Sequence, residues 1–277
     1  MKKIHYLFVV GVALALSLPI SCKQKTKKEK TNSETASTKV PVILVHSAWL
    51  GAWQWEATMA HLNQEQLNPI AVDLPGHGQD STPPNEITMD NYVDHLLDII
   101  DHQSEKVVLV GHSFNGITIS RVAELRPDKI KKLIYVTAFL VPNGTSFFSA
   151  VQGVENSKAV EHFYLSEDQS YALVTDEEMH NAFALDIPLE TFNAAKPNIV
   201  PEPSAPLGYA LEITEENFGK LPKYYIECTE DKAIPIAVQR AMYKGKVKKH
   251  FSLASSHTPN FSKPDSLAYY INKIILK

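Results

Sequence analysis

Six short apolar runs recur along the chain from residue 40 onward, and they constrain its fold more than any other feature. They are rich in β-branched residues and do not alternate with polar ones, which is typical of strands buried on both faces of a parallel sheet. The runs are Val40–Val45, Asn68–Asp73, Lys106–Gly111, Lys131–Thr137, Tyr224–Glu227 and Val247–Leu253. Amphipathic stretches of helical length lie between them, at Met89–Asp101, Ser113–Leu125, Ile236–Tyr243 and Ser266–Ile275. This alternation predicts an α/β domain with a mostly parallel sheet of about six strands and helices on both faces.

The alternation is interrupted between about Val141 and Phe218. This region lacks clear buried strands, carries several prolines, and shows short helical patterns at Asp176–Ala184 and Leu189–Ala195. A segment inserted between two strands of a parallel sheet lies above their carboxyl ends, where ligands bind in open α/β sheets. We therefore predict one domain over residues 40–277, with a cap over its site at about 141–218.

The first 39 residues have a different character. Residues 1–21 begin with two lysines after the methionine and continue with an apolar run, which predicts an export signal. The string Leu18-Pro19-Ile20-Ser21-Cys22 resembles the lipobox of bacterial lipoproteins, although Pro19 departs from the usual leucine. We expect a lipid anchor on Cys22, with a plain signal peptide as the alternative.

Residues 22–39 are rich in lysine and have too little apolar surface to fold, so we expect a flexible tether. The chain has a formal net charge of −4, and the two basic leading segments leave the rest of it acidic. An acidic domain is a poor partner for nucleic acid. We expect a protein of the bacterial cell envelope, held at a membrane by the lipid on Cys22, or else secreted or periplasmic. The oligomeric state stays open, with a homodimer as one alternative.

A serine between an apolar run and a helical stretch is the first candidate for chemistry. Ser113 follows Lys106–Gly111, so its hydroxyl is expected at a sharp turn where a helix begins. The helix N-terminus offers N–H groups and positive potential to a developing oxyanion, although a serine there can also be a simple helix cap. The usual pattern G-x-S-x-G has glycine where this chain has Asn115, followed by Gly116. Asn115 therefore either rearranges the turn or points its amide toward the pocket.

A serine nucleophile needs a base, and the base needs an acid that orients it. In this type of fold the acid follows one late strand and the histidine follows the next. Asp231 comes after the run Tyr224–Glu227, and His257 comes after the last run. We therefore predict Asp231 as the acid, with the adjacent Glu230 as its substitute, and His257 as the base.

The backbone N–H groups of Ala48 and Phe114 are the expected oxyanion donors, because one donor follows the first strand and the other follows the nucleophile. The histidines at positions 46 and 112 flank the site and are interpreted as structural, and His77 is assigned no chemistry. The sequence lacks H-E-x-x-H and paired cysteines, so no metal is expected. Gly76-His77-Gly78 lacks the third glycine of a dinucleotide fingerprint, so no cofactor is expected either.

Five strings carry a family resemblance that covers nearly all of residues 40–277. They are VILVHSAWLGAW (42–53), AVDLPGHG (71–78), KVVLVGHSFNG (106–116), YVTAF (135–139) and YIECTEDKAIP (225–235). Together they resemble the plant methylesterase and hydroxynitrile lyase branch of the α/β-hydrolases. The resemblance implies the α/β-hydrolase fold, a triad of Ser113, Asp231 and His257, and oxyanion donors at Ala48 and Phe114.

That branch contains both esterases and lyases. Its lyases carry a lysine directly after the catalytic histidine, where this chain has Thr258, which favours hydrolysis. Ser47 favours a lyase, because esterases of the branch usually have glycine there and lyases threonine. We give the absence of this lysine more weight than the presence of Ser47. We therefore predict a carboxylesterase that cleaves a small, largely apolar ester through an acyl-enzyme on Ser113. Ser47 and Trp49 are expected to contact the substrate. The alternatives are a lyase on the same triad and a non-catalytic lipoprotein that binds a small ligand.

Overall fold

The computed structural model describes residues 39–277. The predicted export signal, Cys22 and nearly all of the predicted tether therefore lie outside the described residues. Within residues 39–277, no helix combines the length and the apolar character that a membrane crossing requires.

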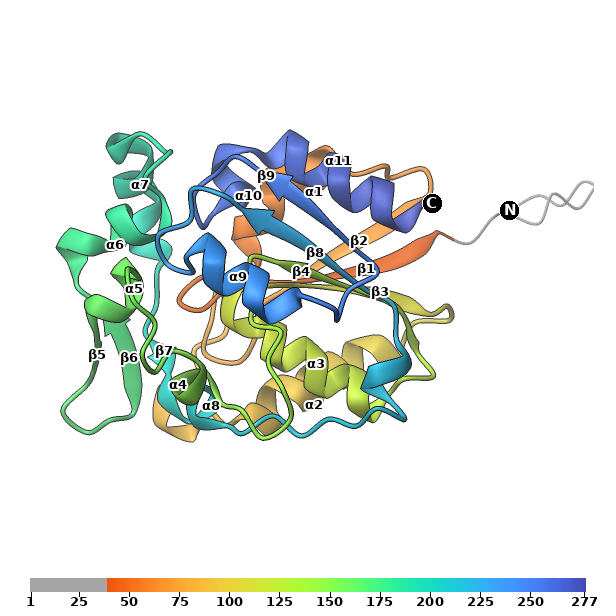
Figure 1. Ribbon diagram of the computed structural model, residues 1–277, viewed down its shortest axis with the longest axis horizontal. Coiled ribbons are helices and arrows are strands. Elements are labelled where there is room, and N and C mark those ends of the chain that lie inside the picture. The colour runs from red at the N-terminus through yellow and green to blue at the C-terminus, as the bar shows by residue number, and fades with distance from the viewer. Residues whose placement is uncertain (1–38) are drawn as a thin grey trace, which may run out of the picture. The chain divides into compact units, whose positions relative to one another are not determined.

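Six parallel strands form the central sheet, in the order β2-β1-β3-β4-β8-β9 (Figure 1). They are β1 (Val40–Val45), β2 (Leu67–Val72), β3 (Val107–His112), β4 (Ile130–Val136), β8 (Lys223–Cys228) and β9 (Lys249–Leu253). All five neighbouring pairs are parallel, which confirms the predicted sheet. The chain runs from β1 outward to β2 and then returns to pair β3 on the other side of β1. Ligands bind beside such a reversal, at the carboxyl ends of the strands.

Helices cover both faces of this sheet. On one face lie α2 (Met89–Asp101), α3 (Gly116–Leu125) and α9 (Ile236–Tyr243), and on the other lie α1 (Glu56–Ala60) and α11 (Pro264–Ile275). Strand β1 shows how both cores are filled, because Ile43 and Val45 join the first core while Val42 and Leu44 join the second. This two-sided burial explains why the strands form apolar runs without alternation.

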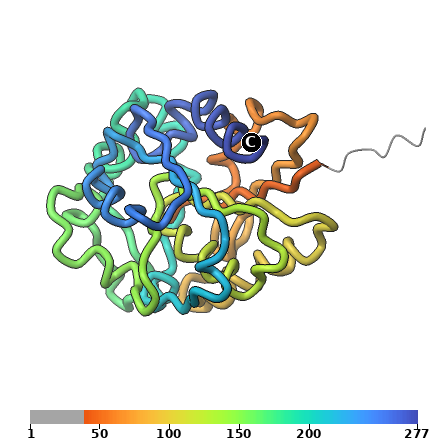
Figure 2. The backbone as a smooth tube through the Cα atoms, turned by 45° about the vertical axis from the view of Figure 1, so that its right-hand side comes forward, coloured from red at the N-terminus to blue at the C-terminus, as the bar shows by residue number. Residues whose placement is uncertain are grey.

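Segments from opposite ends of the described chain lie side by side on the second face. Helix α11, dark blue in Figures 1 and 2, packs beside α1 and the loop that follows it. The Asn272 side chain accepts a hydrogen bond from the backbone N–H of Asn63 at 3.1 Å and donates one to the carbonyl oxygen of His61 at 3.3 Å. The last helix thus holds the connection between β1 and β2 against the sheet.

The segment between β4 and β8 builds a second group of elements, drawn in green and teal in Figures 1 and 2. We call its residues 141–218 the insertion. Its helices are α4 (Phe147–Ala150), α5 (Lys158–Glu161), α6 (Asp176–Phe183), α7 (Leu189–Ala195) and α8 (Ser204–Gly208). An antiparallel sheet, β5-β6-β7, is formed by Phe163–Leu165, Tyr171–Val174 and Glu202–Pro203. The sequence indicated α6 and α7 but not this sheet, because its strands have two to four residues and β5 is largely exposed.

Short helical turns complete the described chain. They are α10 (Pro259–Ser262) and the 3-10 turns Ala52–Trp55, Pro84–Glu86, Ser113–Asn115, Lys196–Asn198 and Phe218–Lys220. The helix predicted from Ser113 therefore begins as a 3-10 turn and continues as α3. This change of winding falls at the predicted nucleophile, where the chain turns from strand to helix.

Candidate active site

Three side chains from distant parts of the sequence meet at the carboxyl edge of the sheet. Ser113 follows β3, Asp231 follows β8 and His257 follows β9. His257 Nε2 lies 2.8 Å from Ser113 Oγ, and His257 Nδ1 lies 2.7 Å from Asp231 Oδ2. Glu230, the predicted substitute for Asp231, is exposed. The imidazole can therefore donate its Nδ1–H to Asp231 and accept the serine proton at Nε2.

The Asp231 carboxylate is held in place from several sides. Its Oδ1 accepts hydrogen bonds from the backbone N–H groups of Ala233, at 2.7 Å, and Ile234, at 2.8 Å. Its Oδ2 accepts a hydrogen bond from the Thr137 hydroxyl in addition to the one from His257. Asp231 and His257 both have fully buried side chains. A buried carboxylate with all these donors is fixed in orientation, so it can hold one tautomer and one rotamer of the histidine.

Ser113 occupies a strained turn. Its φ is +56°, in the left-handed region that residues with a side chain rarely adopt. The turn needs glycine on both sides. A Cβ on Gly111 would lie 2.8 Å from Ile119 Cδ1, and a Cβ on Gly116 would lie 2.5 Å from the carbonyl oxygen of Phe139. The close packing that demands a small residue thus falls on Gly116 rather than on the position before it.

Asn115 ties the head of α3 to the end of β1. Its Nδ2 donates to the carbonyl oxygen of His46 at 2.8 Å, and its Oδ1 accepts from the Thr118 hydroxyl at 2.6 Å. The side chain is buried in these contacts. The sequence left open an amide directed toward the pocket, and the structure directs the amide toward β1 instead. Asn115 is therefore a structural link between the head of α3 and the end of β1.

Two buried histidines flank the triad without a free ring nitrogen to act as a base. His46 donates its Nδ1–H to the carbonyl oxygen of Ser47 at 2.8 Å and accepts from the Leu74 N–H at 3.1 Å through Nε2. His112 Nε2 donates to the carbonyl oxygen of His257 at 2.8 Å. Burial lowers the pKa of both imidazoles well below the usual range of histidine. Within residues 39–277, no group of three or more His, Cys, Asp or Glu side chains is arranged to hold a metal ion.

The loop after β1 carries Ala48 and Trp49, and Trp49 lines a pocket together with Ser113. Ala48 and Phe114, the two predicted oxyanion donors, are both buried. Trp49, the next residue in the loop, has a φ of +64°. Its conformation is held by the insertion, because Trp49 Nε1 donates to the carbonyl oxygen of Ala172 at 2.8 Å and Trp49 O accepts from Val200 N at 2.9 Å.

Glu202 is a buried neighbour of the site that the sequence did not reveal. Its side chain is fully buried in the insertion, and its Oε2 accepts from the Trp49 N–H at 3.0 Å and from His77 Nε2 at 2.8 Å. Its Oε1 accepts from the Tyr92 hydroxyl at 3.0 Å. Burial alone would lower the pKa of His77, but the Glu202 carboxylate, together with the Pro75 carbonyl oxygen and Asp73, raises it above its usual value. No motif marks Glu202, because its partners come from three separate segments.

The insertion also holds the segment that carries His257. Ser256 donates its backbone N–H to Asp186 Oδ2 at 2.9 Å and its hydroxyl to the carbonyl oxygen of Phe183 at 3.1 Å. Thr258 donates its hydroxyl to the same carbonyl oxygen at 2.8 Å. The Phe183 ring lies edge-on to the imidazole, with centroids 5.4 Å apart. Residues on both sides of His257 are thus fixed by one turn of the insertion.

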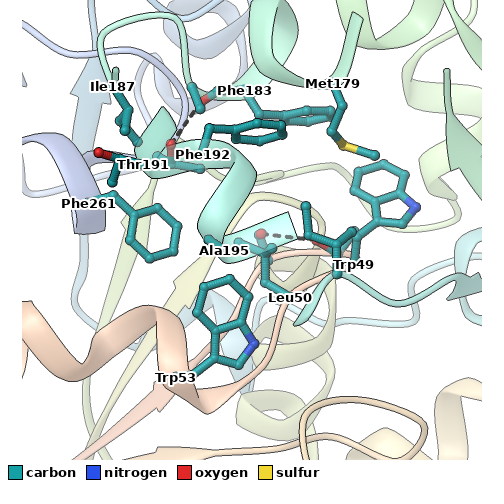
Figure 3. A pocket seen from close by; sticks show the side chains of 15 residues that line it. Trp49, Leu50, Trp53, Met179, Phe183, Ile187, Thr191, Phe192, Ala195 and Phe261 are labelled. Atoms are coloured by element: carbon teal, nitrogen blue, oxygen red, sulfur yellow. Dashed lines mark hydrogen bonds between the residues drawn. The ribbon is translucent and has the colours of Figure 1, made fainter. Parts of the chain in front are cut away.

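Two pockets open beside the triad. Ser113 lines one of them, and the other, shown in Figure 3, is lined by Ser47, Ala48 and Thr258. Trp49 and Phe183 line both pockets, and no charged side chain lines either. The structure therefore places both residues predicted to contact the substrate, Ser47 and Trp49, at a pocket wall. The Ser47 hydroxyl donates to the carbonyl oxygen of Ala48 at 3.1 Å.

A serine on a strained turn between strand and helix, followed in sequence by an aspartate and a histidine, is the site arrangement of the α/β-hydrolases. The Alpha/beta hydrolase family matches residues 42–268. The chain belongs to this family, which confirms the predicted fold.

Similar proteins indicate which branch of the family this chain resembles. The chain is 32% identical over 271 residues to putative methylesterase 13, chloroplastic, of Arabidopsis thaliana, covering 93% of this chain and 60% of that protein. It is 30% identical to methylesterase 7 of the same plant, covering 84% of this chain and 95% of that protein. These similarities confirm the predicted resemblance to plant methylesterases. The chain spans about 60% of the length of the first chloroplastic relatives.

The chain is also similar to bacterial proteins. A pyrethroid hydrolase of Sphingobium wenxiniae is 31% identical over 242 residues, covering 83% of this chain and 86% of that protein. The crystal structure of a pyrethroid hydrolase from Sphingobium faniae JZ-2 has a TM-score of 0.78 at 29% identity, covering 86% of this chain and 97% of that one. The structure of polyneuridine aldehyde esterase, at 24% identity and a TM-score of 0.75, shares the fold.

The hydrogen bond from the Trp49 N–H to Glu202 can be tested without a substrate. We expect Glu202→Gln to speed hydrogen exchange at the Trp49 amide by about tenfold or more, because a hydrogen bond to a charged acceptor is replaced by a weaker one. The matched control is Glu124→Gln, which changes another buried carboxylate that accepts from the insertion, at Thr214 N and Phe218 N. Mass spectrometry of exchange in peptides containing residue 49 measures both. Equal exchange at Trp49 in the two variants would contradict the assigned contact.

Proposed function

We propose that this protein is a carboxylic ester hydrolase that works through an acyl-enzyme on Ser113. The observation that carries the proposal is the continuous row Ser113–His257–Asp231, with contacts of 2.8 and 2.7 Å at the head of α3. Relatives named methylesterase and pyrethroid hydrolase, at 30–32% identity, support the same reaction class.

In the first half of the reaction, Ser113 Oγ attacks the ester carbonyl carbon and its proton passes to His257 Nε2. The carbonyl oxygen becomes an oxyanion, which the N–H groups of Ala48 and Phe114 stabilise. Asp231 stabilises the imidazolium that forms. The bond from carbon to the alcohol oxygen then breaks, and the alcohol leaves with the proton from His257.

In the second half, water takes the place of the alcohol. His257 Nε2 accepts a proton from the water as its oxygen bonds to the acyl carbon. The bond between that carbon and Ser113 Oγ breaks, and the serine recovers its proton from His257. The carboxylic acid is released and the site returns to its starting state.

The substrate class follows from the pocket walls. Both pockets are lined by apolar and aromatic side chains with a few hydroxyl groups, and neither has a charged side chain. A charged substrate would lose its hydration there without gaining a partner. We therefore propose neutral, apolar esters as substrates.

The lyase alternative finds less support. A lyase that releases cyanide needs a cation for the departing anion, and the resemblance places that cation directly after the histidine. This position is Thr258, whose hydroxyl is engaged with the carbonyl oxygen of Phe183. Neither pocket offers a lysine or an arginine in its place.

The proposed setting is the bacterial cell envelope, with a lipid on Cys22 as the link to a membrane. It rests on the sequence of residues 1–39 alone. The substrates would then be esters that reach the cell surface or the periplasm.

The proposed function is tested by comparing ester hydrolysis by the wild-type protein and by a variant that lacks the nucleophile. Purified wild-type protein is expected to hydrolyse p-nitrophenyl acetate and to react with a fluorophosphonate probe, since both need an activated serine. Ser113→Ala should lose the probe reaction completely and retain no more than about 0.1% of the hydrolysis. A wild-type protein that neither reacts with the probe nor hydrolyses any ester in a panel of aryl and methyl esters would overturn the proposal.

Variants of two adjacent acidic residues test whether Asp231 orients His257 or only contributes negative charge. We expect Asp231→Asn to lower kcat for p-nitrophenyl acetate by about 10³- to 10⁴-fold, because an amide favours the wrong imidazole tautomer. Glu230→Gln removes the same charge one residue away, on an exposed side chain, and should stay within about twofold of wild type. Comparable losses in both variants would contradict the role given to Asp231.

A further inference from the structure

The two pockets beside the triad are separated by one aromatic wall. Trp49 and Phe183 contact each other with ring centroids 5.3 Å apart, and both line each pocket. The pockets are similar in size, about 560 and 530 Å³ including their open mouths. The Phe183 ring also lies edge-on to the His257 imidazole, so the wall contacts the triad.

The pocket in Figure 3 is built to receive an apolar group. Trp53 and Phe261 stand on one side of it, and Met179, Phe183 and Phe192 of the insertion face them from the other. Apart from the indole N–H groups of Trp49 and Trp53, its polar side-chain groups are three hydroxyls, and two of these are already engaged. The hydroxyls of residues 47 and 258 donate to backbone carbonyl oxygens. A hydrocarbon or aromatic group therefore fits this space better than a charged or strongly hydrogen-bonding one.

The covalent step decides which half of an ester each pocket holds. The acyl group stays bonded to Ser113 after the alcohol has left, so it belongs in the pocket that Ser113 lines. The alcohol leaves with the proton from His257. The pocket in Figure 3 lies next to His257, because Thr258 directly follows this histidine and lines the wall of the pocket.

We propose that the pocket in Figure 3 binds the alcohol half of an ester whose acyl and alcohol halves are both apolar and of similar bulk. This inference rests on the proposed esterase function and deepens it. It also makes the substrate larger than the small ester that the sequence predicts. An ester with a bulky alcohol would span the wall of Trp49 and Phe183, with its carbonyl carbon at Ser113.

Two isomeric esters separate the pockets. Benzyl acetate carries its ring in the alcohol half, and methyl phenylacetate carries the same ring in the acyl half, so the two have the same atoms and similar hydrophobicity. Each pocket has a half-buried alanine in its wall on a helix of the insertion. Ala195 on α7 lines the pocket in Figure 3, and Ala159 on α5 lines the pocket with Ser113. Replacing either with phenylalanine fills one pocket and leaves the other open.

We expect Ala195→Phe to lower kcat/KM for benzyl acetate about tenfold or more and to leave methyl phenylacetate within about twofold of wild type. Ala159→Phe should do the reverse. Proton release in a pH-stat measures both reactions, and thermal melting confirms that each variant is folded. If Ala195→Phe does not fold, Thr191→Phe on an exposed position of the same pocket wall replaces it. Equal losses for both esters, no loss for either, or the opposite pairing would overturn the proposal.

A binding experiment tests the pocket assignment separately from the esterase function. In the Ser113→Ala background, benzyl phenylacetate binding can be followed by tryptophan fluorescence, because Trp49 and Trp53 line the pocket in Figure 3. Ala195→Phe and Ala159→Phe should each raise Kd about tenfold. Weakened binding without any wild-type hydrolysis would overturn only the esterase function. Hydrolysis by the wild type with unchanged binding in both variants would overturn only the two-pocket assignment.

Discussion

The hydrogen bond between Asp231 Oδ2 and His257 Nδ1 is the contact on which the rest of the site depends. It fixes the proton on Nδ1 and leaves Nε2 free to face Ser113. Much of the surrounding structure serves this contact. The parallel sheet brings the ends of β8 and β9 together, two backbone N–H groups and the Thr137 hydroxyl orient the carboxylate, and burial excludes water that would compete with it.

The segments around the triad are connected on both sides of the reaction centre. Beneath it, the buried Gln54 accepts from the Ser47 N–H at 3.1 Å and donates to His112 Nδ1 at 3.2 Å, and His112 holds the His257 carbonyl. Above it, the insertion holds Trp49 through Glu202 and the histidine segment through Phe183. The loop with Ala48 and the loop with His257 are therefore connected through one polar network.

The sequence predicts the sheet and the meeting of the triad for the same physical reason. Strands buried on both faces form apolar runs, and residues directly after such runs converge at one edge of a parallel sheet, as Ser113, Asp231 and His257 do. Contacts made by the insertion could not be predicted in this way. Glu202 lies in a two-residue strand among prolines, and its partners become neighbours only after folding. The small sheet went unpredicted because its strands are too short to show a period.

The proposed reaction passes through a covalent bond between an acyl group and Ser113, so the most direct measurement is the mass of the protein during turnover. Wild-type protein mixed with excess p-nitrophenyl acetate and quenched in acid within milliseconds should gain the mass of one acetyl group, about 42 Da, located by peptide mapping on Ser113. The gain should be absent from Ser113→Ala. Hydrolysis at the wild-type rate with no acyl group on residue 113, at any quench time, would contradict the account.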